Sequence, residues 1–400
     1  MCILKWFGLQ VAGLLVALLV LFVVIGKYPS VGAKGADVLR GMLGDKVVAR
    51  VEMVVINVQD SFLKLKYQMG LENPVQDWVS TPSMLVSPTL VVDTLTPLFP
   101  TKTPSSISRN LPPPTPSIDL PWHPPEIIPL NQAEDEGVWI PYVKDSNGNT
   151  VAYKAFLQPD SSRPYTLVTI VAVDLSRTRL HFVLGSLEPS LSGSPARLGS
   201  IPEGLLDGEL LAAFNGGFQA RHGQFGAMAD GIQALPPRDG LGTLGIFGNG
   251  DVVLGEWGTD LFFSPDMVSY RQNGPLVVHK GFINIRIYNN SPEDWGYTVV
   301  DVSPTVRSGI GLSKDNHTLY YFCGPSLTMD ALAKSMKAAG AYNAIQLDIN
   351  NYWVLFVKIN QVGSTLMANP LLPHLMVDGV SRYLTTSQRD FFFITSLLSK

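Results

Sequence analysis

The sequence predicts an α+β protein, in which a mixed β-sheet domain with few helices follows a transmembrane helix and a proline-rich stalk. Three features of the 400-residue chain predict this fold class. Residues 6–26 carry no charge, residues 81–130 hold 13 of the 30 prolines and no glycine, and after about residue 130 short apolar runs alternate with glycine-rich turns. They divide the chain into the segments 1–35, 36–70, 71–130 and 131–400, with the core of the last segment at about 205–396.

The composition excludes several classes of protein. Hydrophobic residues make up 46% of the chain and charged residues 16%, so at least one folded core is expected. The net charge of −4 provides no overall basic field, which excludes a dedicated nucleic-acid partner. Two cysteines cannot form a disulfide scaffold, and the six histidines show no metal-binding spacing.

The uncharged run at 6–26 is long enough to cross a bilayer, because each helical residue adds about 1.5 Å. Lysines flank it on both sides, so the charges give no orientation. We expect an uncleaved single-pass anchor in the cell membrane, with the C-terminal domain extracytoplasmic. A cleaved signal peptide is the alternative, with Val31-Gly32-Ala33 as a loose cleavage site.

Two further segments precede the domain. Residues 36–69 are predicted to form one helix, because valines recur at three- and four-residue steps, as in Val47, Val51, Val54 and Val58. Membrane, a partner helix or self-association with a second copy could cover this stripe. The proline-rich residues that follow predict an extended, semi-rigid spacer.

Short strands are expected throughout the domain. The predicted strands are 165–173, 180–184, 244–247, 251–254, 276–278, 298–302, 317–322 and 344–348. The first two look like a pair, and Asn249-Gly250 predicts a hairpin. A helix capped by Thr328 and closed by Gly340 predicts, with its flanking strands, a crossover unit.

Four places could carry chemistry. Asn215-Gly216-Gly217 follows an apolar run, and such a turn can bring backbone N–H groups to an anion, although it can also be a plain tight turn. Arg307 lies among small residues and could meet a phosphate or form a structural ion pair. Asp348 and Asp378 could act as acids or bases, or cap turns.

Several motifs together resemble the phosphodiester glycosidase family, the group around the lysosomal uncovering enzyme. Phe214-Asn215-Gly216-Gly217-Phe218 is similar to its Asn-Gly/Ala-Gly-aromatic motif, Pro304 to Gly311 to its Pro-Arg-Thr-Ala-Xaa-Gly strand, and Ala344 to Asp348 to its Ala-Leu-Asn-Leu-Asp strand. The family commonly continues that Asp with Gly-Gly-Gly-Ser. Here Ile349 to Trp353 follow instead, so the binding surface beside Asp348 must differ.

The resemblance implies hydrolysis of a glycosidic bond whose leaving group is a phosphate ester. It implies Asp348, Arg307 and Asn215 as catalytic residues. The residues that it implies as substrate contacts are Gly216, Gly217, Phe218 and Asp378. The substrate would be a sugar phosphodiester in an envelope glycan or exopolysaccharide. No cofactor is required, although Asp, Asn and carbonyl oxygens could bind a divalent cation such as calcium.

Two other readings stay open. The chain could be an envelope protein that binds an anionic glycan without catalysis. It could also be a scaffold that self-associates through residues 36–69.

Overall fold

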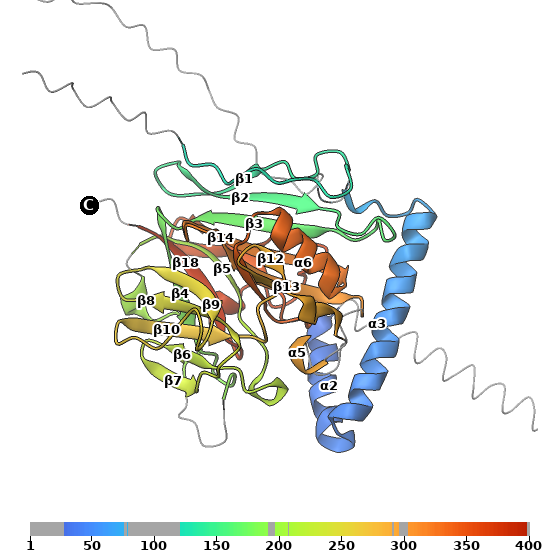
Figure 1. The fold of residues 1–400 in the computed structure, drawn as a ribbon, viewed down its shortest axis with the longest axis horizontal. Helices are drawn as coiled ribbons and strands as arrows, with labels where there is room; N and C mark the ends of the chain where they lie inside the picture. Colours follow the sequence, from blue (N-terminus) through green and yellow to red (C-terminus); the bar gives the residue numbers. More distant parts are fainter. Residues whose placement is uncertain are drawn as a thin grey trace, which may run out of the picture.

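The computed structural model describes residues 28–75, 78, 121–190, 197–206, 208–289, 292–295 and 303–397 (Figure 1). This part is mostly β-sheet with few helices, in agreement with the predicted class. None of the helices in these ranges is apolar and long enough to span a membrane. The predicted anchor at 6–26, the predicted strand at 298–302 and most of the proline-rich segment lie outside the described residues.

The strands form three sheets. The first has the order β1 (Ile140–Lys144), β2 (Thr150–Leu157), β3 (Val168–Asp174), β14 (Thr318–Leu327), β13 (Thr305–Leu312), β15 (Asn343–Gln346), β11 (Val278–His279), β12 (Phe282–Ile283). The second has the order β17 (Thr365–Pro370), β16 (Phe356–Val362), β5 (Leu210–Asn215), β18 (Phe391–Ser396), β4 (Thr178–Val183). The third has the order β7 (Ile232–Leu235), β6 (Ala227–Ala229), β10 (Met267–Gln272), β8 (Gly242–Phe247), β9 (Val252–Glu256).

Four helices and four 3-10 turns complete the described elements. The helices are α2 (Pro29–Leu43), α3 (Asp45–Gln68), α5 (Pro292–Trp295) and α6 (Met329–Ala338). The 3-10 turns are η1 (Glu203–Leu205), η2 (Ala220–His222), η3 (Ile285–Tyr288) and η4 (Arg382–Leu384).

The main core lies between the first and second sheets. The ring of Tyr321 on β14 is 5.1 Å from Phe214 on β5 and 5.2 Å from Phe356 on β16. Cys323 is buried in the same cluster, so its thiol is part of the core. The opposite face of the first sheet is covered by α6, whose Leu332 and Met336 are fully buried (Figure 1). The first two sheets therefore form a sandwich with a helix on its outer side.

The prediction of a mixed sheet needs correction, because the ladders between the described strands are antiparallel. The predicted crossover unit is present, since α6 connects β14 to β15. However, β13 lies between these two strands and pairs antiparallel with both. The strands β14 and β15 thus run parallel to each other but are not adjacent in the sheet.

A second correction concerns the predicted strand pair at 165–173 and 180–184. The first strand, β3, pairs with β2 and β14, whereas β4 pairs with β18 in the other sheet. The turn between them thus carries the chain from one layer of the sandwich to the other. The hairpin at Asn249-Gly250 is confirmed, with Gly250 at φ +95°. The cap at Thr328 is also confirmed, because its hydroxyl accepts from the N–H of Ala331.

The single helix predicted at 36–69 is instead a hairpin of α2 and α3. Gly44 separates them at φ +80°, a backbone conformation that glycine adopts without strain. The hairpin contacts the domain through polar groups: Asp60 pairs with Arg163, and Asp37 pairs with Arg221. Consequently α2 and α3 lie along one side of the domain (Figure 1).

The apolar stripe of α3 does not face the domain. Seven apolar side chains spaced by three or four residues are 47–63% exposed: Val47, Val51, Val54, Val58, Phe62, Leu65 and Met69. Residues 121–130, which the sequence analysis assigned to the linker, pack on the domain. There Ile127 is buried, and Trp139 Nε1 donates to the carbonyl of Pro125 at 2.8 Å.

Candidate active site

The candidate site begins where β5 ends, at Asn215. Its backbone lies opposite Phe391, the first residue of β18, so the residues before β18 meet the residues after β5. The segment after β15 reaches the same place, because the N–H of Asp348 donates to the carbonyl of Gly216 at 3.1 Å. Three distant segments of the chain therefore converge at Asn215.

Asn215 holds this junction together. Its Nδ2 donates to the carbonyl of Gly216 and to Ser308 Oγ, both at 3.0 Å, and its Oδ1 accepts from the Tyr321 hydroxyl at 2.8 Å. The Ser308 hydroxyl in turn donates to the backbone carbonyl of Asp348 at 2.7 Å. Asn215 is 3% exposed, so its contacts support the turn-holding role rather than a sugar contact.

The Gly216-Gly217 turn does bind an anion, and that anion is the carboxylate of Asp390. The N–H of Gly217 donates to Asp390 Oδ2 at 3.1 Å, and the N–H of Gly216 donates to the Asp390 carbonyl at 3.0 Å. A Cβ on Gly216 would lie 2.1 Å from Asp390 Oδ2, which explains the need for glycine. The amides that the sequence assigned to a phosphate are thus occupied by the protein itself.

Asp348 forms a buried ion pair with Arg389 through its Oδ2. The two residues are 5% and 7% exposed. Asp348 Oδ1 accepts from the N–H of Asn350 at 2.9 Å, and Arg389 Nη2 also donates to the carbonyl of Gly217 at 3.1 Å. Burial raises the pKa of Asp348, and the charge of Arg389 opposes that rise. A carboxyl group with a raised pKa beside a cation is suited to acid–base chemistry.

Arg307 lies on the other face of the sheet, which corrects its expected convergence with Asp348. It precedes Ser308 on β13, and successive strand residues point to opposite faces. Ser308 reaches the junction, whereas Arg307 is fully buried and donates to Gln346 Oε1 at 2.6 Å and to the carbonyl of Leu327 at 2.8 Å. In this structure its guanidinium holds strand ends together.

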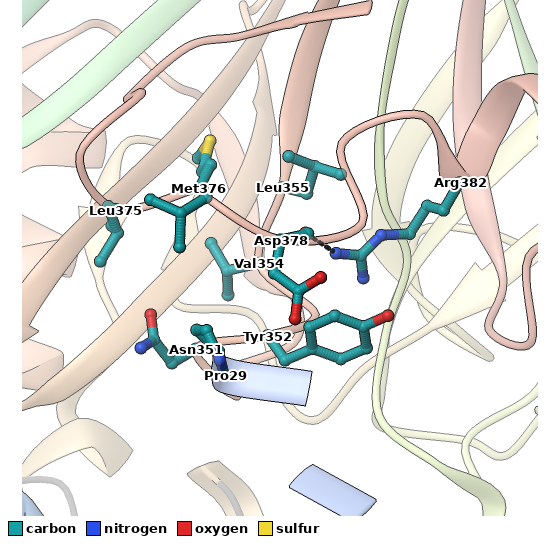
Figure 2. A pocket seen from close by; sticks show the side chains of 10 residues that line it. Pro29, Asn351, Tyr352, Val354, Leu355, Leu375, Met376, Asp378 and Arg382 are labelled. Atoms are coloured by element: carbon teal, nitrogen blue, oxygen red, sulfur yellow. Dashed lines mark hydrogen bonds between the residues drawn. The ribbon is translucent and has the colours of Figure 1, made fainter. Parts of the chain in front are cut away.

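Phe218 and Asp378 lie on different sides of the junction. Phe218 is 4% exposed and packs against Phe225, with ring centroids 6.0 Å apart. Asp378 lines a pocket together with Tyr352, Arg382 and Pro29, the first residue of α2 (Figure 2). Asp378 is thus placed where it can meet a ligand, whereas Phe218 is part of the packing.

Two aromatic residues link this pocket to the ion pair. The guanidinium of Arg382 lies 4.2 Å from the ring of Tyr352 and 5.2 Å from that of Trp353. The guanidinium of Arg389 lies 5.1 Å from the same Trp353 ring. The bulky segment that follows Asp348 therefore positions two arginines beside it through cation–π contacts.

Three charged residues of the site, Arg389, Asp390 and Arg271, were not predicted from the sequence. The last two form an ion pair with no exposed side-chain surface, in which Arg271 Nε donates to Asp390 Oδ2 at 2.7 Å. The adjacent charges of Arg389 and Asp390 directly precede the apolar run of β18. Opposite charges at the start of a buried strand could have marked this place as a site.

The part of the chain described by the structure contains no group of three or more His, Cys, Asp or Glu that could hold a metal ion. His222 lies near the site, and burial together with the neighbouring arginines lowers its pKa to about 3. It is therefore a neutral imidazole at physiological pH.

Comparisons with known proteins concern both structure and sequence. The chain is similar to the catalytic domain of zebrafish N-acetylglucosamine-1-phosphodiester alpha-N-acetylglucosaminidase, auto-inhibited by its pro-peptide, with 16% identity and a TM-score of 0.42 over 63% of this chain and 86% of that chain. It is also similar to a hypothetical protein from Synechocystis, with 12% identity and a TM-score of 0.37 over 64% of each chain. A comparison with curated proteins found no match. The sequence profile of the phosphodiester glycosidases matches residues 208–348, and this part of the chain is therefore a phosphodiester glycosidase family domain.

Proposed function

We propose that the chain is a membrane-anchored, extracytoplasmic hydrolase that cleaves the bond between a sugar and a phosphate ester in an envelope glycan or exopolysaccharide. One observation is the main support for hydrolysis. Asp348, at the end of the family-matched segment, is buried against Arg389 where three chain segments meet. The family supports the substrate class, a sugar phosphodiester.

The residues divide the reaction between them. Cleavage of the bond at the anomeric carbon passes through an oxocarbenium-like transition state, which a carboxylate stabilises. The Asp348 carboxylate stabilises that cation or activates the attacking water. The leaving phosphate ester is a weak base and needs little protonation. Arg389 binds it through Nε, which is buried and has no hydrogen-bond partner within the described residues.

Turnover of synthetic aryl sugar phosphodiesters by the purified chain tests this proposal. Release of the sugar and the aryl phosphate supports hydrolysis. Binding of anionic glycans on an array without turnover of any phosphodiester would favour the non-catalytic alternative. That alternative draws support from the buried position of Asp348 and the bulky residues after it.

The pH dependence should reveal the ionisation of Asp348. If the ionised carboxylate is the active form, kcat/KM rises with pH through a pKa above the ordinary aspartate value of 3.8. Arg389 holds this pKa down, so Arg389→Gln is expected to shift the rising limb to higher pH as well as lowering the rate. The exposed Arg286→Gln serves as the control and leaves the limb in place. A limb that stays in place or moves to lower pH in Arg389→Gln contradicts the assignment.

Residues 6–26 provide the proposed anchor. Their uncharged sequence and their length support a bilayer-spanning segment. The full chain is expected to stay in the membrane fraction after alkaline extraction, and deletion of 6–26 is expected to release it. Release of the unaltered chain would contradict anchoring.

We further propose that the exposed stripe of α3 pairs with that of a second copy. The spacing of Val47, Val51, Val54 and Val58 is typical of a helix–helix seam, and the polar contacts of the hairpin are already made with the domain. Val54→Asp is expected to halve the mass of the protein part in detergent, measured by multi-angle light scattering. Val362→Asp, at an equally exposed valine elsewhere, is the control. A monomeric wild-type chain would contradict self-association.

A further inference from the structure

The pocket in Figure 2 contains polar groups that the Asp348–Arg389 pair does not use. It forms between the segment after Asp348, the segment that ends at Asp378, and the start of α2. Its apolar lining includes Val354, Leu355, Leu375 and Met376, and its polar side chains are Asn351, Asp378 and Arg382. Apolar surface with a few polar groups is typical of small-ligand pockets.

Arg382 is held in place before any ligand arrives. Its residue is 8% exposed, its Nε donates to the carbonyl of Gly379 and its Nη2 to that of Asp378, both at 2.8 Å. Its guanidinium carbon lies 4.2 Å from the centre of the Tyr352 ring, and Gly379 approaches so closely that a Cβ would lie 2.9 Å from Arg382 Nη2. The third nitrogen, Nη1, is buried and finds no acceptor in the described part of the chain. A buried charged donor without an acceptor is costly, so Nη1 is the atom of this pocket that is available to an acceptor from outside the described residues.

The pocket also offers acceptors. Asn351 Oδ1 is buried and has no donor within the described ranges. Asp378 Oδ2 accepts from the N–H of Ser30 at 3.2 Å. A matching ligand therefore carries an anionic group and nearby hydroxyl groups.

We propose that this pocket binds an acidic sugar residue of the substrate. Its phosphate or carboxylate accepts from Nη1 of Arg382, the guanidinium nitrogen that has no acceptor among the described residues, in a charge-assisted hydrogen bond. Its hydroxyl groups donate to Asn351 and Asp378, and its C–H faces pack on the apolar lining. The pocket is closed in this structure and leaves no room for a sugar, so the proposal requires the first turn of α2, which includes Pro29, to withdraw and a ligand hydroxyl to replace the Ser30 N–H.

The position of the pocket defines the substrate class further. Trp353 lies between Arg382 and Arg389, so the acidic sugar sits beside the proposed catalytic pair. The substrate is then a glycan that carries an acidic group in addition to the phosphodiester. That the acidic sugar belongs to the substrate rests on the proposed function. That the pocket binds an acidic sugar does not.

Calorimetric titration of the full chain with three probes tests the proposal. The probes are glucose 6-phosphate, glucuronate and neutral methyl glucoside. At least one of the two acidic sugars is expected to bind about tenfold more tightly than the neutral sugar, the gain that one charged hydrogen bond gives. Arg382→Gln is expected to remove this difference, and Asn351→Leu to weaken acidic-sugar binding several-fold. Arg286→Gln removes an exposed arginine and leaves all affinities unchanged.

The outcomes separate this inference from the proposed function. The acidic-sugar proposal is overturned if acidic and neutral sugars bind equally. It is also overturned if a folded Arg382→Gln protein still binds acidic sugars as tightly. If Arg382→Gln does not fold, unchanged affinity in Asn351→Leu overturns it. Selective binding of acidic sugars without hydrolysis of any phosphodiester would support the acidic-sugar pocket and contradict the proposed hydrolase activity. The better acidic probe identifies phosphate or carboxylate as the natural group.

Discussion

Asp348→Asn is expected to lower kcat for a sugar phosphodiester by about 10²–10⁴-fold, the usual contribution of a positioned acid–base group. The amide keeps the shape of the side chain, and its oxygen can still accept from the N–H of Asn350, whereas its NH2 group cannot accept from Arg389 as Oδ2 does. It cannot carry the negative charge that stabilises the sugar cation. Initial rates on an aryl sugar phosphodiester, with circular dichroism to check folding, measure the effect.

The matched control is Asp315→Asn, in the turn between β13 and β14. Asp315 also accepts from a backbone N–H, that of His317 at 3.1 Å, but its side chain is 67% exposed and lies in a surface turn. Its replacement should leave the rate unchanged. Full activity of a folded Asp348→Asn protein would show that the carboxylate has no catalytic role, whatever the family of the domain.

Asn215, Gly216 and Asp348 could be predicted as candidate site residues because each lies at the end of a recognisable apolar run. Polar residues at strand ends are local features, and glycine pairs signal close approach of the backbone. The ligand of that glycine turn could not be predicted. Asp390 reaches it only because β18 pairs with β5, a contact between residues about 175 positions apart.

Arg307 illustrates a second limit. Alternation along a strand shows that Arg307 and Ser308 face opposite sides, but not which side faces the site. In the folded chain the odd-numbered positions of β13 face α6, where Gly309 leaves room for Met336. Which face of β13 points toward the site depends on the packing of α6 and of the second sheet, and both are formed by other parts of the sequence.

The helical segment shows the same dependence on context. A glycine inside a helical pattern costs only about 1 kcal/mol, so Gly44 did not rule out a continuous helix. Contacts such as Asp60 with Arg163 and Asp37 with Arg221 hold both helices of the hairpin against the domain. These partners lie more than 100 residues away, outside any local pattern.

Arg271→Met is expected to reduce the free energy of unfolding by about 3–5 kcal/mol, because it leaves the charge of Asp390 buried without its partner. Arg271 donates to Asp390 and to the carbonyls of Phe218, Phe225 and Gln272, so its loss also frees buried acceptors. Denaturant unfolding measures the change. Arg286→Met breaks an ion pair with Asp294 in which the arginine side chain is 48% exposed, and should cost only about 0–1 kcal/mol.

A double variant separates the unpaired charge from the lost packing. In Arg271→Met with Asp390→Asn, neither charge of this pair remains, so the protein should be more stable than the sum of the two single changes predicts. Because Asp390 holds the Gly216-Gly217 turn, the double variant should still lose catalytic rate even where it regains stability. Additive losses of stability would mean that Arg271 and Asp390 are not coupled.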